Sequence, residues 1–158
     1  MRFVKESFIR ASQEHVFSFH EQPDVLQLLL PPWESARVIE SASISEVGSR
    51  AVIETRVLGP ITFKWVAEHT VYDPPHRFED IQVKGPFRSW HHSHVIEPHK
   101  SGAILRDRID YKPPLGFLGR AFAPILIQGR LQRLFDYRHQ ITREWCEERE
   151  MRRMKAEG

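Results

Sequence analysis

The chain has 158 residues, of which 41% are hydrophobic and 28% charged, and its formal net charge is +2. This length is typical of one domain, and the composition excludes an intrinsically disordered chain. So small a net charge gives no support to a dedicated nucleic-acid-binding surface. We therefore expect a single domain over residues 1–158 that binds no nucleic acid.

Cysteine usage and the N-terminal residues bear on the cellular compartment. The one cysteine, Cys146, cannot form an intramolecular disulfide, and this fits a reducing environment. The first residues lack the apolar stretch of a signal peptide. No segment approaches the ~20 consecutive apolar residues of a membrane span. We expect a cytoplasmic protein without stable membrane insertion.

The first elements are one strand and two short helices. Residues 2–10 alternate between apolar and polar side chains, which predicts a strand. Ser12 is a typical N-cap for a short helix over 13–20. A second short helix is predicted over 23–30, and it should end at Pro31-Pro32, because proline has no backbone N–H to continue a helix.

Between about residues 35 and 112 the apolar period changes to two, which is typical of strands. Glycine, proline and aspartate at the interruptions supply turn chemistry. Such short connections make neighbouring strands antiparallel. The sequence predicts a curved seven-stranded antiparallel sheet, with the first strand at an edge. Its other strands are expected over residues 35–45, 49–58, 61–72, 77–84, 86–97 and 102–112.

Residues 115–152 have the pattern of one long amphipathic helix. Pro124 is expected to break or kink it. The apolar stripe, with one charge in its middle, consists of Ile127, Leu131, Leu134, Arg138, Ile141 and Trp145. A curved sheet with one apolar face and a single helix with a matching stripe predict an α+β fold in which the sheet wraps around the helix. One helix cannot fill so curved a sheet, so we expect an internal cavity.

This order of elements resembles the SRPBCC superfamily of helix-grip proteins. The residues that carry the resemblance are Phe8, Pro31-Pro32, Tyr72-Asp73-Pro74-Pro75, Phe78-Glu79-Asp80, the run 85–94, the run 107–114 and Phe135-Asp136-Tyr137-Arg138. The superfamily includes START lipid-transfer domains, polyketide aromatase/cyclases and the birch pollen allergen. The chain is most similar to small bacterial proteins described as ligand-binding SRPBCC or cyclase/dehydrase-like. The resemblance implies the helix-grip fold and a hydrophobic cavity, but no particular reaction.

Alternation along three strands assigns the side chains that face inward. The inward sets are Phe63, Trp65, Ala67, His69 and Val71; Trp90, His92, His94 and Ile96; and Leu105, Asp107, Ile109 and Tyr111. An apolar wall with a few convergent polar groups is typical of small-molecule sites. The candidate ligand-binding residues are Phe63, Trp65, His69, Phe78, Trp90, His92, His94, Asp107, Tyr111, Leu134, Arg138 and Ile141.

Two interpretations remain for the charged pair within this set. Arg138 would clamp a ligand carboxylate or enolate, with Asp107 orienting it. Alternatively, Asp107 and Arg138 form a structural ion pair that fixes the helix on the sheet, since a buried charge needs a partner. We favour the structural ion pair.

The histidines also have two interpretations. His92 and His94 share one strand face, as metal ligands often do, and His69 would lie nearby. No coordinating motif accompanies them, so hydrogen-bonded core histidines are the favoured interpretation. We assign no metal, no cofactor and no catalytic residue.

An apolar patch surrounds Pro124. It consists of Phe117, Leu118, Phe122, Ile125 and Leu126. The patch is interpreted as a cover over the cavity mouth, with a homodimer contact as the second interpretation and a membrane-touching edge as the third.

These patterns predict a non-enzymatic carrier or sensor of a small hydrophobic or aromatic molecule. The alternative is a cyclase or dehydratase that uses Asp107, Arg138 and a cavity histidine. A third hypothesis is an interaction module whose pocket is filled by its own side chains.

Overall fold

The computed structural model describes the backbone of residues 1–56, 61–113 and 116–157, and side chains there except at 116–125, 154 and 157. The described elements are, in chain order, β1 (Arg2–Ile9), α1 (Gln13–His20), α2 (Val25–Leu28), β2 (Ala36–Glu40), β3 (Arg50–Arg56), β4 (Thr62–Asp73), β5 (Arg77–Lys84), β6 (Ser89–His99), β7 (Gly102–Lys112) and α3 (Gly116–Glu157). This order confirms the predicted α+β class.

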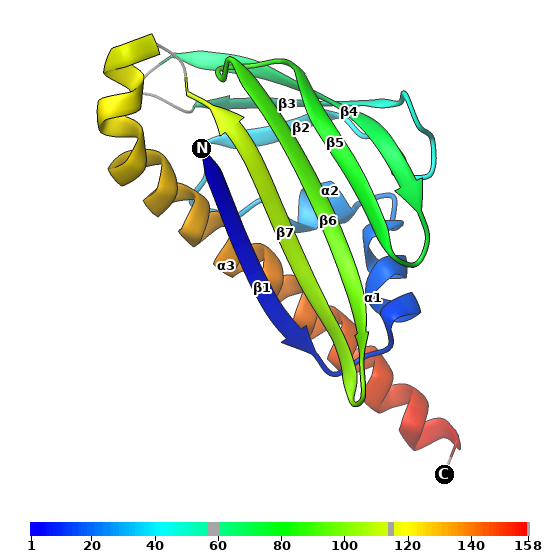
Figure 1. Cartoon of the computed structure of the whole chain (residues 1–158). Helices are drawn as coiled ribbons and strands as arrows, with labels where there is room; N and C mark the ends of the chain where they lie inside the picture. Colours follow the sequence, from blue (N-terminus) through cyan, green and yellow to red (C-terminus); the bar gives the residue numbers. More distant parts are fainter. Residues whose placement is uncertain (57–60, 114–115, 158) are drawn as a thin grey trace.

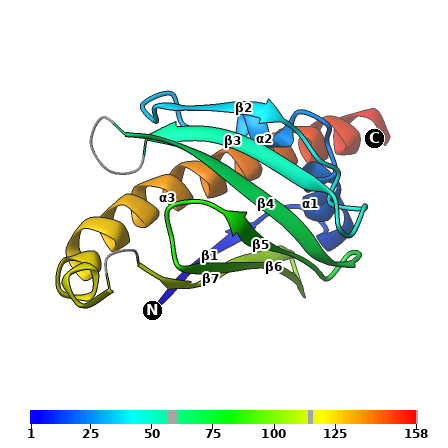
Figure 2. The same cartoon turned by 90° about the horizontal axis from the view of Figure 1, so that it is seen from above.

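The strands form one antiparallel sheet in the order β1-β7-β6-β5-β4-β3-β2. Every pair except β1–β7 is joined by a short connection, so the order follows the chain, and β1 adds to the free edge of β7. The sheet curls around α3, which crosses its concave side (Figures 1 and 2). The predicted edge position of the first strand is thus confirmed.

Two irregularities in the pairing of β4 with β5 alter which side chains face the concave side. The first, between Val66 and Ala67 of β4, adds Val83 to β5, and the second, between His69 and Val71, adds Thr70 to β4. An added residue reverses the alternation of its own strand beyond that point. Tyr72 therefore faces inward and packs against Phe17, so the prediction that Val71 shares the inner face with His69 is wrong.

Several predicted boundaries need correction. The strand predicted over 35–45 ends at Glu40, and the following loop carries Ile44 into the core. The helix predicted over 23–30 spans only Val25–Leu28. The strand predicted over 86–97 begins at Ser89, after the Gly85-Pro86 turn. The end of the strand predicted over 49–58 lies outside the described residues. The N-cap prediction is confirmed, because Ser12 Oγ accepts a hydrogen bond from the His15 backbone N–H at 3.2 Å.

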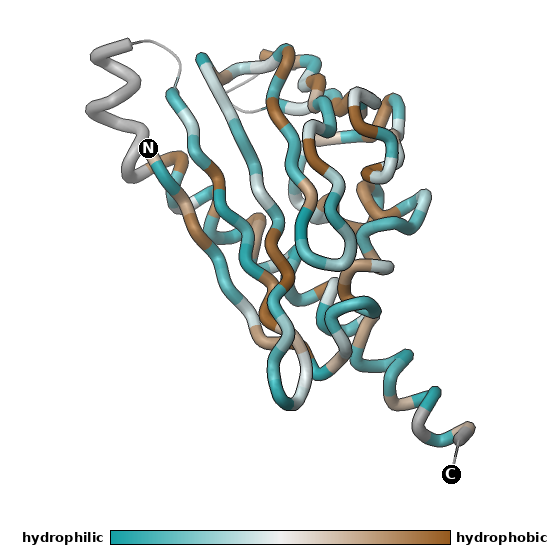
Figure 3. The backbone as a smooth tube through the Cα atoms, turned by 45° about the vertical axis from the view of Figure 1, so that its right-hand side comes forward, coloured by the Kyte–Doolittle hydropathy of each residue, from teal (hydrophilic) through white to brown (hydrophobic). Residues whose placement is uncertain are grey.

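The long helix α3 runs from Gly116 to Glu157 without interruption, so of the break or kink expected at Pro124 the break does not occur. A proline removes one backbone hydrogen bond, and the bonds on both sides maintain this helix. Its last turns are mostly hydrophilic and extend beyond the sheet (Figure 3). None of the helices in the described ranges is long and apolar enough to cross a lipid bilayer.

The face of α3 that packs on the sheet differs from the predicted stripe. The fully buried helix residues are Leu131, Phe135, His139, Thr142 and Cys146. The predicted stripe is centred on Leu134, one residue or about 100° around the helix from this line. Leu134, Arg138 and Ile141 are only partly buried. The helix therefore packs one face on the sheet, whereas the adjacent face with Leu134, Arg138 and Ile141 is only partly buried.

Candidate functional site

A cavity of about 480 Å³ lies between the concave side of the sheet, α1, α2 and the adjacent face of α3. Most of its lining is apolar. The sequence-predicted residues that line it are Trp65, His69, Phe78, Trp90, His92, His94, Leu134 and Arg138. The second face of α3 thus borders the cavity at Leu134 and Arg138.

One end of the cavity, here called the aromatic end, is formed by Trp65, Phe87 and Trp90. The ring centroids of Trp65 and Trp90 lie 4.9 Å apart at 89°, and those of Phe87 and Trp90 lie 5.0 Å apart. The first contact is edge-to-face, an arrangement that aromatic pairs favour, and the second is tilted at 44°. Phe87 was not predicted to line the cavity, because the alternation was extended back through the turn that precedes Ser89.

The other end, here called the polar end, is formed by Asp80, His92 and His94. Asp80 projects from β5, and the two histidines project from adjacent inward positions of β6. Asp80 Oδ2 lies 3.5 Å from His92 Nδ1 and 3.6 Å from His94 Nε2. The His94 ring also stacks on Phe78, with centroids 4.0 Å apart and 13° between the planes. All three polar groups line the cavity.

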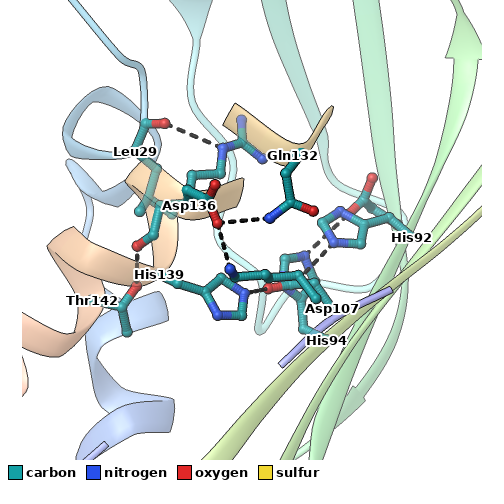
Figure 4. Close-up of polar contacts among 11 residues, drawn as sticks. Leu29, His92, His94, Asp107, Gln132, Asp136, His139 and Thr142 are labelled. Atoms are coloured by element: carbon teal, nitrogen blue, oxygen red, sulfur yellow. Dashed lines mark hydrogen bonds and ion pairs between the residues drawn. The ribbon is translucent and has the colours of Figure 1, made fainter. Parts of the chain in front are cut away.

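Asp107 lies behind the polar end and holds its rings (Figure 4). Its Oδ1 accepts a hydrogen bond from His92 Nε2 at 2.8 Å and lies 2.6 Å from His94 Nδ1. Its Oδ2 accepts a hydrogen bond from His139 Nε2 of α3 at 2.6 Å. Because each oxygen is directed at an imidazole, this carboxylate links β6, β7 and α3. Asp107 is itself 3% exposed and is not among the described residues that line the cavity.

The charges of the cluster follow from this geometry. Burial opposes the charge on His94, but the Asp107 and Asp80 carboxylates outweigh it and raise the pKa of His94 to about 9. Burial also opposes ionisation of Asp107, yet the surrounding histidines hold the pKa of Asp107 well below its usual value. Burial and the nearby His94 charge lower the pKa of His92. The polar end therefore holds one imidazolium between two carboxylates.

A further histidine, His20 at the end of α1, also lines the cavity. It is 4% exposed, and its ring centroid lies 5.9 Å from that of His94. Burial and the His94 charge lower the pKa of His20 to about 3, so its ring is neutral. His20 Nδ1 contacts the Val16 carbonyl at 2.9 Å. The sequence interpretation missed this residue, because it assigned cavity-facing side chains only on the strands and the long helix.

The prediction of an ion pair between Asp107 and Arg138 is wrong, because each residue has other partners. Within the described residues, the hydrogen bonds and close ion pairs of Asp107 go to histidines. Arg138 Nε instead donates to the Leu29 carbonyl at 3.2 Å, and its guanidinium lies 5.2 Å from the centroid of Phe135. Burial lowers the pKa of Arg138. The arginine joins α3 to α2 at the cavity wall.

Three other predicted residues lie elsewhere. Phe63, near the start of β4, is half-buried but is not part of the described cavity lining. Tyr111 is 2% exposed and packs against Phe87 and Trp90 in the core beneath the aromatic end. Ile141 packs against the core around α1. Alternation finds the inner face of a strand, but it does not tell the cavity from the packed core.

The most important missed residue is His139. It is 2% exposed and supplies the only described helix hydrogen bond to Asp107. A signal was present, because His139 lies four residues after Phe135 on the same helix face and continues the line to Thr142. Of the patch predicted around Pro124, the side chains of Phe117, Leu118, Phe122 and Ile125 lie outside the described part of the chain. Leu126 borders the cavity and is 66% exposed.

A seven-stranded sheet that curls around one long helix and leaves a lined cavity defines a helix-grip domain. The family described as "Polyketide cyclase / dehydrase and lipid transport" matches residues 9–135. The chain belongs to this family, within the SRPBCC superfamily. No curated protein matches the chain significantly.

Solved structures share the fold at low sequence identity. A protein from Chromobacterium violaceum has a TM-score of 0.69 at 14% identity, over 92% of this chain and 97% of its own. A Thermus thermophilus protein has a TM-score of 0.66 at 18% identity, over 90% and 97%. Norcoclaurine synthase from Thalictrum flavum, in complex with a transition-state analogue, has a TM-score of 0.63 at 15% identity, over 91% and 94%. These similarities support the helix-grip fold.

Proposed function

We propose that the chain binds one small molecule in the cavity, apolar or aromatic over most of its length and carrying one polar group. The division of the cavity into an aromatic end and a polar end carries this proposal. Its volume, about 480 Å³, falls within the range of roughly 300–1,000 Å³ that is typical of small-molecule sites.

Burial of apolar surface would supply most of the affinity. Removing about 200 Å² of apolar ligand surface from water contributes on the order of 5 kcal/mol, at about 25 cal/mol per Å². The loss of ligand freedom opposes this gain. A pre-formed aromatic wall keeps that cost small, because Trp65 and Trp90 already hold each other in place. Micromolar binding is therefore within reach.

The polar end would select among apolar ligands. His69 is 9% exposed and lines the cavity, and its Nδ1 has no hydrogen-bond partner among the described residues. A buried polar atom without a partner is costly, so a ligand oxygen that bonds to it recovers free energy. The His94 imidazolium favours an acidic or oxygen-rich group at the same end.

The known relatives are consistent with this role. The family description includes lipid transport, and the norcoclaurine synthase structure holds a transition-state analogue. Both point to organic molecules bound by the same fold. Their ligands are not transferred to this chain, because the solved structures are under 20% identical to it.

Binding is testable with the fluorescent probe 8-anilinonaphthalene-1-sulfonate, which has two aromatic parts and one anionic group. We expect the wild-type chain to bind one probe molecule with micromolar affinity. Ala67→Trp places a large ring in the cavity, since Ala67 lines it. This variant should bind the probe at least about tenfold more weakly, a loss of about 1.4 kcal/mol.

The matched control is Lys64→Trp, on the same strand but at an exposed position outside the described lining. It should bind the probe like wild type, and both variants should unfold cooperatively. Equal binding by Ala67→Trp and wild type would show that the probe lies outside the cavity, and the proposal would fail.

A cyclase or dehydratase is the second candidate function. The observation that favours it is the position of Asp80 and His94 at the wall of an otherwise apolar cavity. A phenyl-substituted 1,3,5-triketone is a suitable probe, because it loses one water when it closes to a pyranone. A carrier would return the triketone unchanged, whereas a cyclase would accelerate the loss of water measured by mass spectrometry.

A further inference from the structure

We propose that Asp80, His92 and His94 form a binding site for one divalent transition-metal ion, with zinc as the expected occupant. This inference goes beyond the proposed ligand role, because the ion would bind whether or not an organic molecule fills the cavity. The sequence suggested two histidines with His69 as a third ligand, whereas the structure supplies the Asp80 carboxylate instead.

The separations of Asp80 from the two histidine nitrogens fit a tetrahedral ion. One nitrogen of each histidine and one oxygen of Asp80 lie within 4.8 Å of one another. Asp80 Oδ2 is 3.5 Å from His92 Nδ1 and 3.6 Å from His94 Nε2. Zinc bonds of about 2.1 Å place tetrahedral neighbours about 3.4 Å apart, and octahedral neighbours about 3.0 Å apart. The two Asp80 separations are closer to the tetrahedral value, which is the geometry that zinc prefers.

The opposite nitrogens of the two rings both face Asp107, and a carboxylate is a common partner behind metal-bound histidines. His92 Nε2 donates to Asp107 at 2.8 Å, and His94 Nδ1 lies 2.6 Å from the same oxygen. Each imidazole thus has one nitrogen on Asp107 and the other on the Asp80 side. A carboxylate behind a ligating histidine fixes the ring orientation and raises its affinity for the metal. His139 completes this support through the second oxygen of Asp107.

The two carboxylates and the open side of the cluster also suit a dication. The ion would replace the proton that makes His94 cationic between Asp80 and Asp107. The three proposed ligands line the cavity, so a fourth position would face it. His69 Nδ1, unpartnered within the described residues, lies in the same wall, and His69 pairs with Asp80 across β4 and β5. Three protein ligands and an open position would let the ion bind a ligand oxygen.

The direct test is zinc binding by the untagged chain after dialysis against EDTA. Calorimetry with zinc chloride should show one ion per chain with a dissociation constant of about 1 μM or below. Asp80→Asn keeps the size of the side chain but removes the charged ligand. We expect it to bind zinc at least about 100-fold more weakly, because even the loss of a supporting outer residue costs about 10–100-fold.

His91→Gln is the matched control, because His91 is on the same strand but faces away from the cluster and contacts Glu79 at 2.8 Å. Zinc binding by this variant should equal that of wild type. Absence of saturable binding by wild type, or unchanged binding by Asp80→Asn, would overturn the inference, the latter by assigning the ion to another site.

A second measurement does not depend on the folding of any variant. The wild-type chain loaded with cobalt should show the intense visible absorption of a four-coordinate ion, and X-ray absorption of the zinc form should show two imidazole ligands. Six-coordinate spectra without imidazole scattering would contradict the site. Probe binding by the metal-free chain is measured separately, so a failed metal site and a failed ligand cavity give different results.

Discussion

The side chains of β6 that face the cavity change from Trp90, which packs against other rings, to His94, which lies between two carboxylates. The aromatic end is held by contacts without strict direction, so a neighbour can adjust when one ring changes. The polar end is held by hydrogen bonds and charges with fixed partners, so removing one group leaves others unsatisfied. β6 thus contributes to an aromatic end that tolerates substitutions and to a polar end that does not.

The largest effect on the free energy of unfolding is expected for Asp107→Ala, next to the polar end. Loss of this carboxylate leaves the His94 charge with one buried partner instead of two and frees the hydrogen-bonding nitrogens of His92 and His139. The free energy of unfolding should fall by about 3–5 kcal/mol, as measured by urea denaturation. Asp110→Ala, which removes an exposed ion pair with Arg2, should cost no more than about 1 kcal/mol. Similar losses in the two variants would mean that Asp107 is not a structural centre.

Phe135 and Leu134 are neighbouring helix residues that both line the cavity but differ in how closely they are packed. Phe135 is 1% exposed and contacts Phe3 and His92, so Phe135→Ala should lower the free energy of unfolding by about 3–5 kcal/mol. Leu134 is half-buried and borders the cavity. Leu134→Ala should cost about 1 kcal/mol, because much of its surface already faces open space. Equal costs would show that the cavity is filled.

Cys146 provides a buried titratable group that lacks the paired carboxylates of His94. Burial raises the pKa of the Cys146 thiol to about 12, from an ordinary value of 9.0. Between these values the unfolded chain has lost the proton and the folded chain keeps it, so stability falls as pH rises. Relative to Cys146→Ala, the wild-type free energy of unfolding should drop by about 1.4 kcal/mol per pH unit between pH 9 and 12. A constant difference between the two proteins over this range would contradict the assigned environment.

The smallest effect on the free energy of unfolding is expected for an exposed contact between β1 and α3. Lys5 of β1 forms an ion pair with Asp136 of α3, and the Asp136 side chain is half exposed. Lys5→Ala should lower the free energy of unfolding by about 0.5 kcal/mol, and high salt should remove most of the difference. A cost of several kcal/mol that salt does not change would place this contact with the buried network instead.

The fold could be predicted from the sequence because the strand and helix periodicities are strong and lie in separate segments of the chain. Alternation over residues 35–112 and turn residues between the strands predicted a meander, and short connections left antiparallel pairing as the simple solution. The irregularities in β4 and β5 could not be predicted, because an added residue changes the pairing without a distinctive residue type. Inward alternation in β6 and β7 was predicted correctly from Trp90 to Ile96 and from Leu105 to Tyr111.

The candidate site was harder to predict than the fold. The helical stripe around Leu134 merges two faces, one packed on the sheet and one on the cavity, and a wheel cannot divide them. Because the predicted stripe is offset by one residue from the buried helix face, His139 was not predicted to be buried. For the same reason, Arg138 rather than the histidines was predicted as the partner of Asp107. The role of Asp80 likewise depends on the β5–β6 register, which pairs Asp80 with His92. Such cross-strand pairing is set by the tertiary structure.

The central claim, a cavity that accepts a ligand along its aromatic and polar ends, is tested most directly by a crystal structure of the chain with 8-anilinonaphthalene-1-sulfonate. We predict the rings of the probe between Trp65, Trp90 and Leu134, with the sulfonate toward His94. A cavity filled by its own side chains, with the probe absent or bound on the outer surface, would contradict the account.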